Sequence, residues 1–133
     1  MIYFLDTNII IYSVKNQYPA LREHFESVPA TSVCVPSVVC AEIEYGARKS
    51  HDYSKTMRVY RPFLNAFTEA PFSEKAVQEY GIIRAELEKA GTPIGGNDML
   101  IAAIAKAAGG TLVTHNTGEF SRISGLLLED WTM

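Results

Sequence analysis

Four acidic side chains of this chain stand where they could support chemistry: Asp6, Glu42, Asp98 and Glu119. Asp6 and Glu119 each follow closely on a short apolar run of the kind that forms a buried strand. Carboxylates that are brought together repel one another and raise each other's pKa unless a cation is present. Oxygen donors suit a hard ion, Mg²⁺ or, as a substitute, Mn²⁺. If the fold gathers these acids, they predict a divalent-metal site.

Each of these acids also has an ordinary structural interpretation. Asp6 is a good N-cap for a helix that begins at the next residue. Asp98 lies in a predicted first helical turn, where the helix dipole favours an acid by about 0.3–1 kcal/mol. Glu42 could form an ion pair with another segment, and Glu119 could be a solvated loop acid. Both interpretations stay open for every one of the four.

The position of Glu42 in its predicted helix is the most informative. At about 100° per residue, Ser37, Glu44 and Arg48 share one narrow arc, the expected solvent face. Glu42 lies about 160° from Glu44, among apolar neighbours. A carboxylate on an apolar face is costly unless a hydrogen bond or a cation meets it, and no cation lies one turn away in this helix. We therefore favour a metal ion, rather than a cation from another segment, as the partner of Glu42.

The segments around Asp98 and Glu119 carry further polar groups. Asn97 is predicted to cap the helix that contains Asp98, and the two glycines before it would let a phosphate approach. His115 and Asn116 follow the predicted strand at 112–114. His115 could be a general base, although a histidine at the start of a loop more often packs and forms hydrogen bonds.

The elements that must position these side chains alternate along the chain. Strands are predicted at 2–5, 33–35, 68–70, 112–114 and 126–128. Helices are predicted at 7–15, 19–27, 37–50, 53–66, 73–90 and from Asn97 to before Gly109, with Ser37 as a cap and Gly91 as a stop signal. Such alternation is typical of an α/β fold, in which helices cover both faces of a parallel sheet. Ligands of such sheets bind outside the carboxyl ends of the strands.

Length and composition fit one globular domain. The chain has 133 residues, of which 47% are hydrophobic. Its longest apolar stretch, residues 99–108, is about half of what a membrane-spanning helix needs. The first residues lack the features of a secretory signal. Cys34 and Cys40 form neither a disulfide framework nor a zinc motif, and we expect two reduced thiols in a soluble cytoplasmic protein.

The charge balance does not by itself indicate a nucleic-acid partner. The net charge is −3, from 12 basic and 15 acidic residues, but it becomes +1 if the four candidate ligands are set aside. Between Arg48 and Arg61 five cations stand against one acid, near Tyr53 and Tyr60. This segment could contact RNA, or it could be an ordinary solvated helix face.

Several short motifs, taken together and in order, resemble the PIN-domain family. They are Leu5-Asp6-Thr7-Asn8, then Glu42 with Tyr45-Gly46, then residues 91–103 around Gly95-Gly96-Asn97-Asp98, and then residues 114–120 around Asn116 and Glu119. More narrowly, the chain resembles the VapC ribonuclease toxins of bacterial toxin–antitoxin pairs. The resemblance extends over essentially the whole chain, to Glu129-Asp130-Trp131.

The resemblance implies a single PIN domain over residues 1–133, with a three-layer α/β/α architecture around a central parallel sheet. It also implies an Mg²⁺-dependent endoribonuclease that leaves 5′-phosphate and 3′-hydroxyl ends. Asp6 and Asp98 would be the principal metal ligands, and Glu42 would complete the ligand set or orient the water. Many PIN domains have an aspartate where this chain has Asn116, so Glu119 is taken as the fourth acid. Whether one or two ions bind stays open.

The resemblance further implies partners: an RNA substrate, with transfer RNA attractive, a VapB-like antitoxin and a second copy of the chain in a homodimer. The main alternative is a PIN scaffold that binds RNA or protein without cutting, because Asn116 replaces an acid. A phosphoacceptor receiver domain would need a lysine after a late strand, and none follows Lys106. A dinucleotide-binding domain would need a glycine-rich loop where Asp6-Thr7-Asn8 stands.

Overall fold

The computed structural model describes all residues, 1–133, and contains one five-stranded sheet. Its strands are short and are β1 (Tyr3–Leu5), β2 (Val33–Pro36), β3 (Thr68–Ala70), β4 (Thr111–Val113) and β5 (Leu127–Glu129). They lie in the order β3-β2-β1-β4-β5, and every neighbouring pair is parallel. The predicted α/β class, the parallel sheet and all five strands are confirmed.

Helices connect the strands throughout. They are α1 (Thr7–Val14), α2 (Pro19–Ser27), α3 (Ser37–Lys49), α4 (Tyr53–Asn65), α5 (Glu74–Ala90), α6 (Gly96–Ala107), the short α7 (Thr117–Phe120) and the 3-10 turn η1 (Ala30–Ser32). The sequence did not predict α7 or η1, which are too short to show a helical period. None of the helices is both long enough and apolar enough to cross a bilayer.

Two predicted helix caps are wrong. The cap of α3 is Pro36 rather than Ser37, and the cap of α6 is Gly95 rather than Asn97. Both capping residues have extended backbone and provide no side-chain hydrogen bond to the helix. The side chains of Ser37 and Asn97 therefore belong to the first turns of α3 and α6.

The core lies between the sheet and its covering helices. Leu5, Leu112 and Val113 on the central strands are fully buried, as expected for strands covered on both faces. Helix α6 is buried nearly all round from Met99 to Ala105, which confirms the apolar pattern of that segment. Trp131 near the C-terminus is 1% exposed and closes one side of the core.

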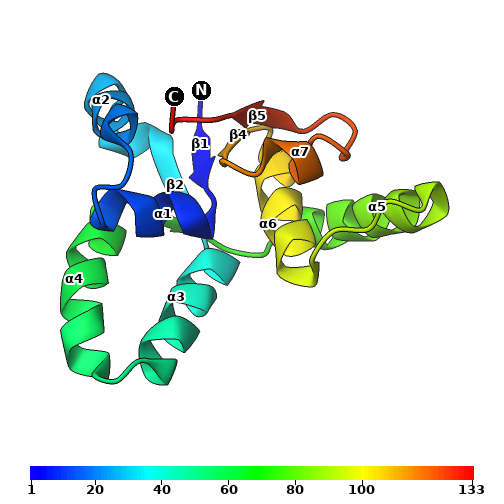
Figure 1. Cartoon of the computed structure of the whole chain (residues 1–133). Coiled ribbons are helices and arrows are strands. Elements are labelled where there is room, and N and C mark those ends of the chain that lie inside the picture. The colour runs from blue at the N-terminus through cyan, green and yellow to red at the C-terminus, as the bar shows by residue number, and fades with distance from the viewer.

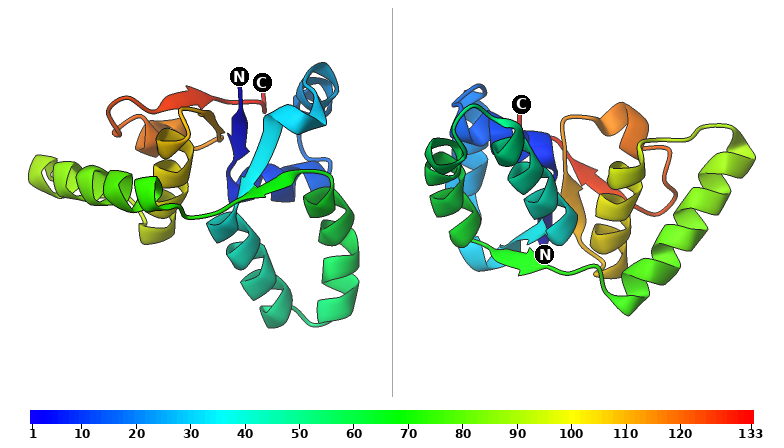
Figure 2. Two further views of the ribbon diagram at one scale, coloured as in Figure 1. Left: turned by 180° about the vertical axis from the view of Figure 1, so that it is seen from behind. Right: turned by 90° about the horizontal axis from the view of Figure 1, so that it is seen from below.

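The strand order places a topological switch point at the middle of the sheet. From β1 the chain proceeds outward through β2 to β3 on one side, and it fills β4 and then β5 on the other. Figure 1 and Figure 2 show the consequence, with α1–α4 on one side of β1 and α5–α7 on the other. The connections that leave the carboxyl ends of β1 and β4 therefore separate at the position where sheets of this kind usually bind their ligands.

Candidate active site

Asp6 lies at this switch point, directly after β1. It is the N-cap of α1, and its Oδ1 accepts a hydrogen bond of 2.8 Å from the backbone N–H of Thr7. Its Oδ2 accepts a second bond of 2.8 Å from Oγ1 of Thr114 on the neighbouring strand connection. Burial raises the pKa of Asp6 above its usual value, the two hydrogen bonds oppose that shift, and the charge of Glu42 adds to it. Asp6 therefore caps a helix and also holds an acid in place at the sheet edge.

Glu42 reaches the same edge from α3. Its Oε1 accepts a bond of 2.6 Å from the hydroxyl of Thr7. The buried side of α3 is formed by Val39, Ile43 and Ala47, and Glu42 is only half-buried beside it. Tyr45, which the helical arc of about 100° per residue places among the apolar neighbours of Glu42, does not lie on the buried side, because this residue is 66% exposed. The alternative of a structural ion pair is also excluded, since no cation pairs with Glu42.

Asp98 approaches from the first turn of α6. Burial raises its pKa to about 6, with further contributions from the charges of Asp6, Glu42 and Glu119. Gly95 explains how this carboxylate fits, because a Cβ at that position would lie 3.3 Å from Oδ2 of Asp98. The absence of a side chain at residue 95 leaves that oxygen accessible.

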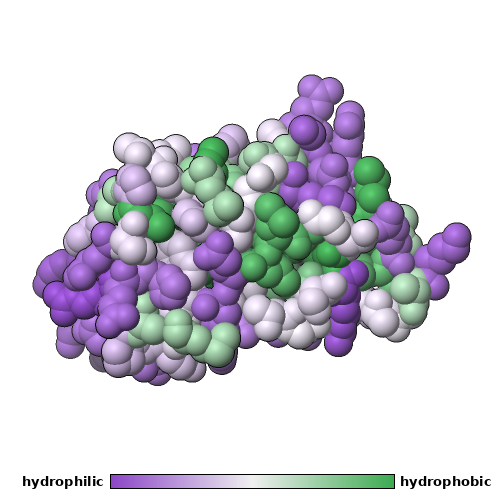
Figure 3. Space-filling model, turned by 90° about the horizontal axis from the view of Figure 1, so that it is seen from above, coloured by the Kyte–Doolittle hydropathy of each residue, from purple (hydrophilic) through white to green (hydrophobic).

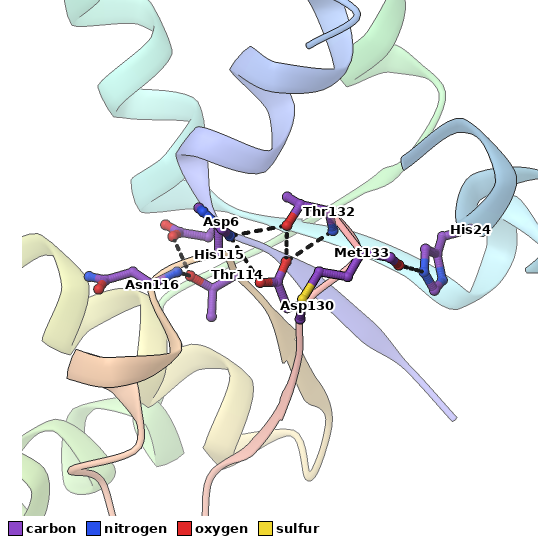
Figure 4. Close-up of polar contacts among 8 residues, drawn as sticks. All are labelled: Asp6, His24, Thr114, His115, Asn116, Asp130, Thr132 and Met133. Carbon is purple, nitrogen blue, oxygen red and sulfur yellow. Dashed lines mark hydrogen bonds and ion pairs between the residues drawn. The ribbon is translucent and has the colours of Figure 1, made fainter. Parts of the chain in front are cut away.

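Glu119 and Asn116 complete the edge from the connection after β4. The side-chain amide of Asn116 donates to Oε2 of Glu119 at 2.7 Å. The backbone N–H of Asn116 donates to Oγ1 of Thr114, whose hydroxyl bonds to Asp6 (Figure 4). Asn116 therefore orients Glu119, and Thr114 connects this loop to Asp6.

The structure brings all four predicted acids to one edge, since the charges of the other three act on Asp98. None of them forms an ion pair with a lysine, arginine or histidine. No three acidic, histidine or cysteine side chains are gathered closely enough to hold an ion by themselves. Mg²⁺ usually keeps several waters and is bound through one or two carboxylates together with substrate phosphates, so it needs fewer protein ligands than such a cluster would provide. The donors and the uncompensated charge suit a hard divalent ion.

Two residues of the site were missed by the sequence reasoning, Thr7 and Thr114. Both are threonines that use the hydroxyl to fix a carboxylate, Glu42 and Asp6 respectively. Thr114 could have been predicted from its position directly after a strand, as Asp6 was. Because Leu5 pairs with Val113, the residues that follow the two strands must lie side by side.

A parallel α/β sheet with uncompensated carboxylates at its switch point defines a candidate hydrolase site. The sequence profile of the PIN domain matches residues 3–126. The chain belongs to the PIN-domain family and, within it, to the VapC ribonucleases.

Individual relatives agree with this assignment. The tRNA(fMet)-specific endonuclease VapC of Shigella flexneri is 38% identical over 130 residues, which is 98% of each chain. Ribonuclease VapC2 of Rickettsia felis is 39% identical over 132 residues, again 98% of each chain. The crystal structure of VapBC2 from Rickettsia felis, bound to a DNA fragment from its promoter, superposes with a TM-score of 0.91 at 39% identity. That match covers 98% of this chain and 99% of the other.

Proposed function

We propose that this protein is an Mg²⁺-dependent endoribonuclease that hydrolyses RNA phosphodiester bonds as the toxin of a VapBC-like pair. The observation that carries the proposal is the group of four carboxylates without a cationic partner at the switch point. Mn²⁺ would serve as a substitute ion. When bound, such an ion supplies a nucleophilic water at neutral pH and neutralises charge on the reacting phosphoryl group.

The residues of the chain hold the reacting groups in place. Asp6 and Asp98 would bind the ion. Two hydrogen bonds fix the orientation of the Asp6 carboxylate, and Oδ2 of Asp98 lies next to Gly95, which has no side chain to cover it. Glu42, held by Thr7, would complete the ligand set or orient the attacking water. Glu119, held by Asn116, would bind a second ion or a bridging water.

The role of Glu42 can be tested by metal-dependent stability. Mg²⁺ that binds the native state preferentially should raise the melting temperature of the wild type. The rise should shrink in Glu42→Gln, because the variant loses a negative charge beside the ion. Thermal melts with and without Mg²⁺ measure the difference, and Glu44→Gln on the exposed side of α3 is the matched control. An equal rise in wild type and Glu42→Gln would remove Glu42 from the metal site.

The substrate class that we propose is RNA, with transfer RNA favoured because a relative is named a tRNA(fMet)-specific endonuclease. The cationic segment supports this. Lys55, Arg58 and Arg61 are exposed, recur every three residues on α4 and pair with no acid. Arg58 and Arg61 also line a groove with Tyr53 and Asn65. Unpaired cations beside an aromatic ring are what a phosphate backbone and its bases would contact.

Removing two of these cations should weaken RNA binding without changing the chemical step. For Arg58→Ala with Arg61→Ala we expect a higher KM and a similar kcat. The slope of log affinity against log salt should fall by about 1.4–1.8 if each contacts one phosphate. Arg84→Ala is the control, since Arg84 lies on α5 and already pairs with Glu88. An unchanged salt slope would mean that this face of α4 is only solvated.

A VapB-like antitoxin is the protein partner that we propose, in a groove formed by α1, α2 and α4. Leu21, Phe25 and Phe63 line this groove with polar residues at its rim. Helix α1 has 8 residues and is therefore about 12 Å long, with Asp6 at one end and the groove near the other. An extended segment of a few residues could lie in the groove and still reach the carboxylates.

We also propose a homodimer. Both ends of the chain lie at the top of the molecule in Figure 1. Figure 3 shows this face from above, and an apolar area lies near its centre. Ile2 and Leu127, exposed at 43% and 55%, stand at the amino ends of β1 and β5. Such an exposed apolar area suits a contact between protein chains.

Sequencing of RNA 5′ ends after brief expression tests the proposed function. The wild type should create new ends that carry a 5′-phosphate, and an Asp6→Asn control should not. If the purified protein binds RNA but generates no new ends at any Mg²⁺ or Mn²⁺ concentration, the alternative of a non-cutting PIN scaffold replaces the proposal.

A further inference from the structure

The segment at the C-terminus of the chain is tied to the loop that follows β4. Nδ1 of His115 lies 2.9 Å from Oδ2 of Asp130. The other carboxylate oxygen of Asp130 accepts bonds from the backbone N–H and the hydroxyl of Thr132, at 2.9 and 2.6 Å. Because an ionised carboxylate only accepts hydrogen bonds, the imidazole ring donates from Nδ1.

His115 stands between two residues that orient carboxylates of the site. Thr114, on one side of it, bonds to Asp6, and Asn116, on the other, bonds to Glu119. Figure 4 shows the His115 ring directed toward Asp130 and Thr132, while Asp6, Thr114 and Asn116 group on the other side of the loop. Nδ1 of His115 also lies 3.0 Å from Oγ1 of Thr132. Together with the contact to Asp130, this is the only side-chain hydrogen bonding that connects this loop to the C-terminal segment.

The surroundings of the pair restrain it further. Rings of Tyr12 and Tyr18 lie 6.2 and 5.6 Å from the imidazole, between ring centroids. The Asp130 side chain is only 8% exposed, and His115 is its one ion-pair partner. Although burial raises the pKa of Asp130, the bonds from Thr132 and His115 lower it overall. The carboxylate is therefore built into the fold as an anion.

We infer that His115 and Asp130 form a positioning pair that fixes the loop Thr114–Asn116, and through it the orientations of Asp6 and Glu119. Neither residue touches the four carboxylates in a hydrogen bond or ion pair, so the pair acts through Thr114 and Asn116. The inference rests on the proposed function, because it assigns these residues a part in the same site.

Breaking the pair should lower turnover and metal binding together. For His115→Leu we expect kcat to fall about tenfold, with KM changed by less than about twofold, as for a partner that orients a ligand. The rise in melting temperature on adding Mg²⁺ should shrink, and this measurement needs no RNA. His115→Asn should restore most of both properties, because its amide can donate from nearly the position of Nδ1.

Two further variants separate positioning from a general loss of stability. Asp130→Asn keeps the size of the side chain, and together with His115→Leu it forms a double-mutant cycle that should be strongly non-additive in kcat. Gln78→Leu is the control for a new surface leucine, since Gln78 is exposed on α5, outside both the carboxylate site and the cationic segment. It should change neither turnover nor the effect of Mg²⁺.

Additive effects in the cycle, or a His115→Leu variant with normal turnover and a normal Mg²⁺ response, would overturn the inference. So would a His115→Asn variant as impaired as His115→Leu. Failure of the proposed function looks different, because the wild type would then cut no RNA under any condition. In that case the Mg²⁺ melts on the same variants still decide whether the pair supports the site.

Discussion

Replacing Asp98 or Asp6 by asparagine should reduce RNA cleavage by a factor on the order of 10²–10³ or more while the fold survives. Each substitution keeps the size of the side chain and removes one negative ligand from the sheet edge. The Asn side chain at residue 6 can still accept the bond from Thr7, so α1 keeps its cap. Cleavage of a labelled RNA by the purified variants measures the effect. Undiminished cleavage by either variant would contradict the assignment of the site.

The same Asp98→Asn substitution should stabilise the metal-free protein, and more so as the pH rises. The pKa of Asp98 is raised to about 6 from an ordinary 3.8, so the unfolded chain loses this proton first. Between these two pH values the native state binds more protons, and ionisation of Asp98 therefore costs native-state stability as the pH increases. Melts in a chelator from about pH 4 to about pH 7 should show the variant gaining on the wild type across that interval. If the difference in melting temperature between the variant and the wild type narrows over this range, ionisation of Asp98 does not destabilise the native state.

Much of the fold could be predicted because its elements repeat simple patterns. The short apolar runs of β1 and β4 predicted strands, and the long apolar stretch of α6 predicted a buried helix. Gly91 marks the end of α5 with a φ of 72°. Prediction from pattern fails where an element is too short for a period to develop. Helix α7 has only 4 residues, yet it carries Glu119 and so belongs to the site.

The helix starts were mispredicted for a physical reason. Serine and asparagine are preferred N-caps on average. This average preference does not include the other side chains that a particular position must accommodate. Residue 95 must leave room for the Asp98 carboxylate, which glycine does. Pro36, at the end of β2, already has the extended backbone that a capping residue needs. In both cases the neighbouring structure outweighed the local preference.

The sequence predicted the four acids that the structure brings to one edge of the sheet, but it did not predict the groups that orient them. Asp6 and Asp98 are recognisable because each stands at the boundary of an apolar element. Thr7 and Thr114 are ordinary in sequence, and their role exists only once β1 and β4 are paired in register. The sequence thus predicts which charges gather, and the pairing of strands determines how they are held.

An antitoxin that inhibits this protein should do so by placing a cation among the four carboxylates. A free ribonuclease is harmful in its own cell, and an anionic site that is open to RNA is also open to a basic peptide segment. An arginine or lysine beside Asp6, Glu42 and Asp98 would form charge-assisted hydrogen bonds and would compete with Mg²⁺ for the same oxygens. The groove lined by Leu21, Phe25 and Phe63 would hold the apolar part of the segment.

Changing the C-terminal basic residues of the antitoxin to alanine should therefore raise the concentration needed for half-inhibition by roughly 30-fold or more. That factor corresponds to the loss of about 2 kcal/mol when one partner of a buried charge pair is removed. Added Mg²⁺ should weaken inhibition by the unaltered antitoxin, because both cations seek the same carboxylates. An antitoxin with an apolar residue of its groove-binding part changed to alanine is the control, since it should lose affinity without losing this sensitivity to Mg²⁺. Full inhibition by the alanine variants, with Mg²⁺ still binding to the complex, would instead mean that the antitoxin acts at a distance and leaves the site open.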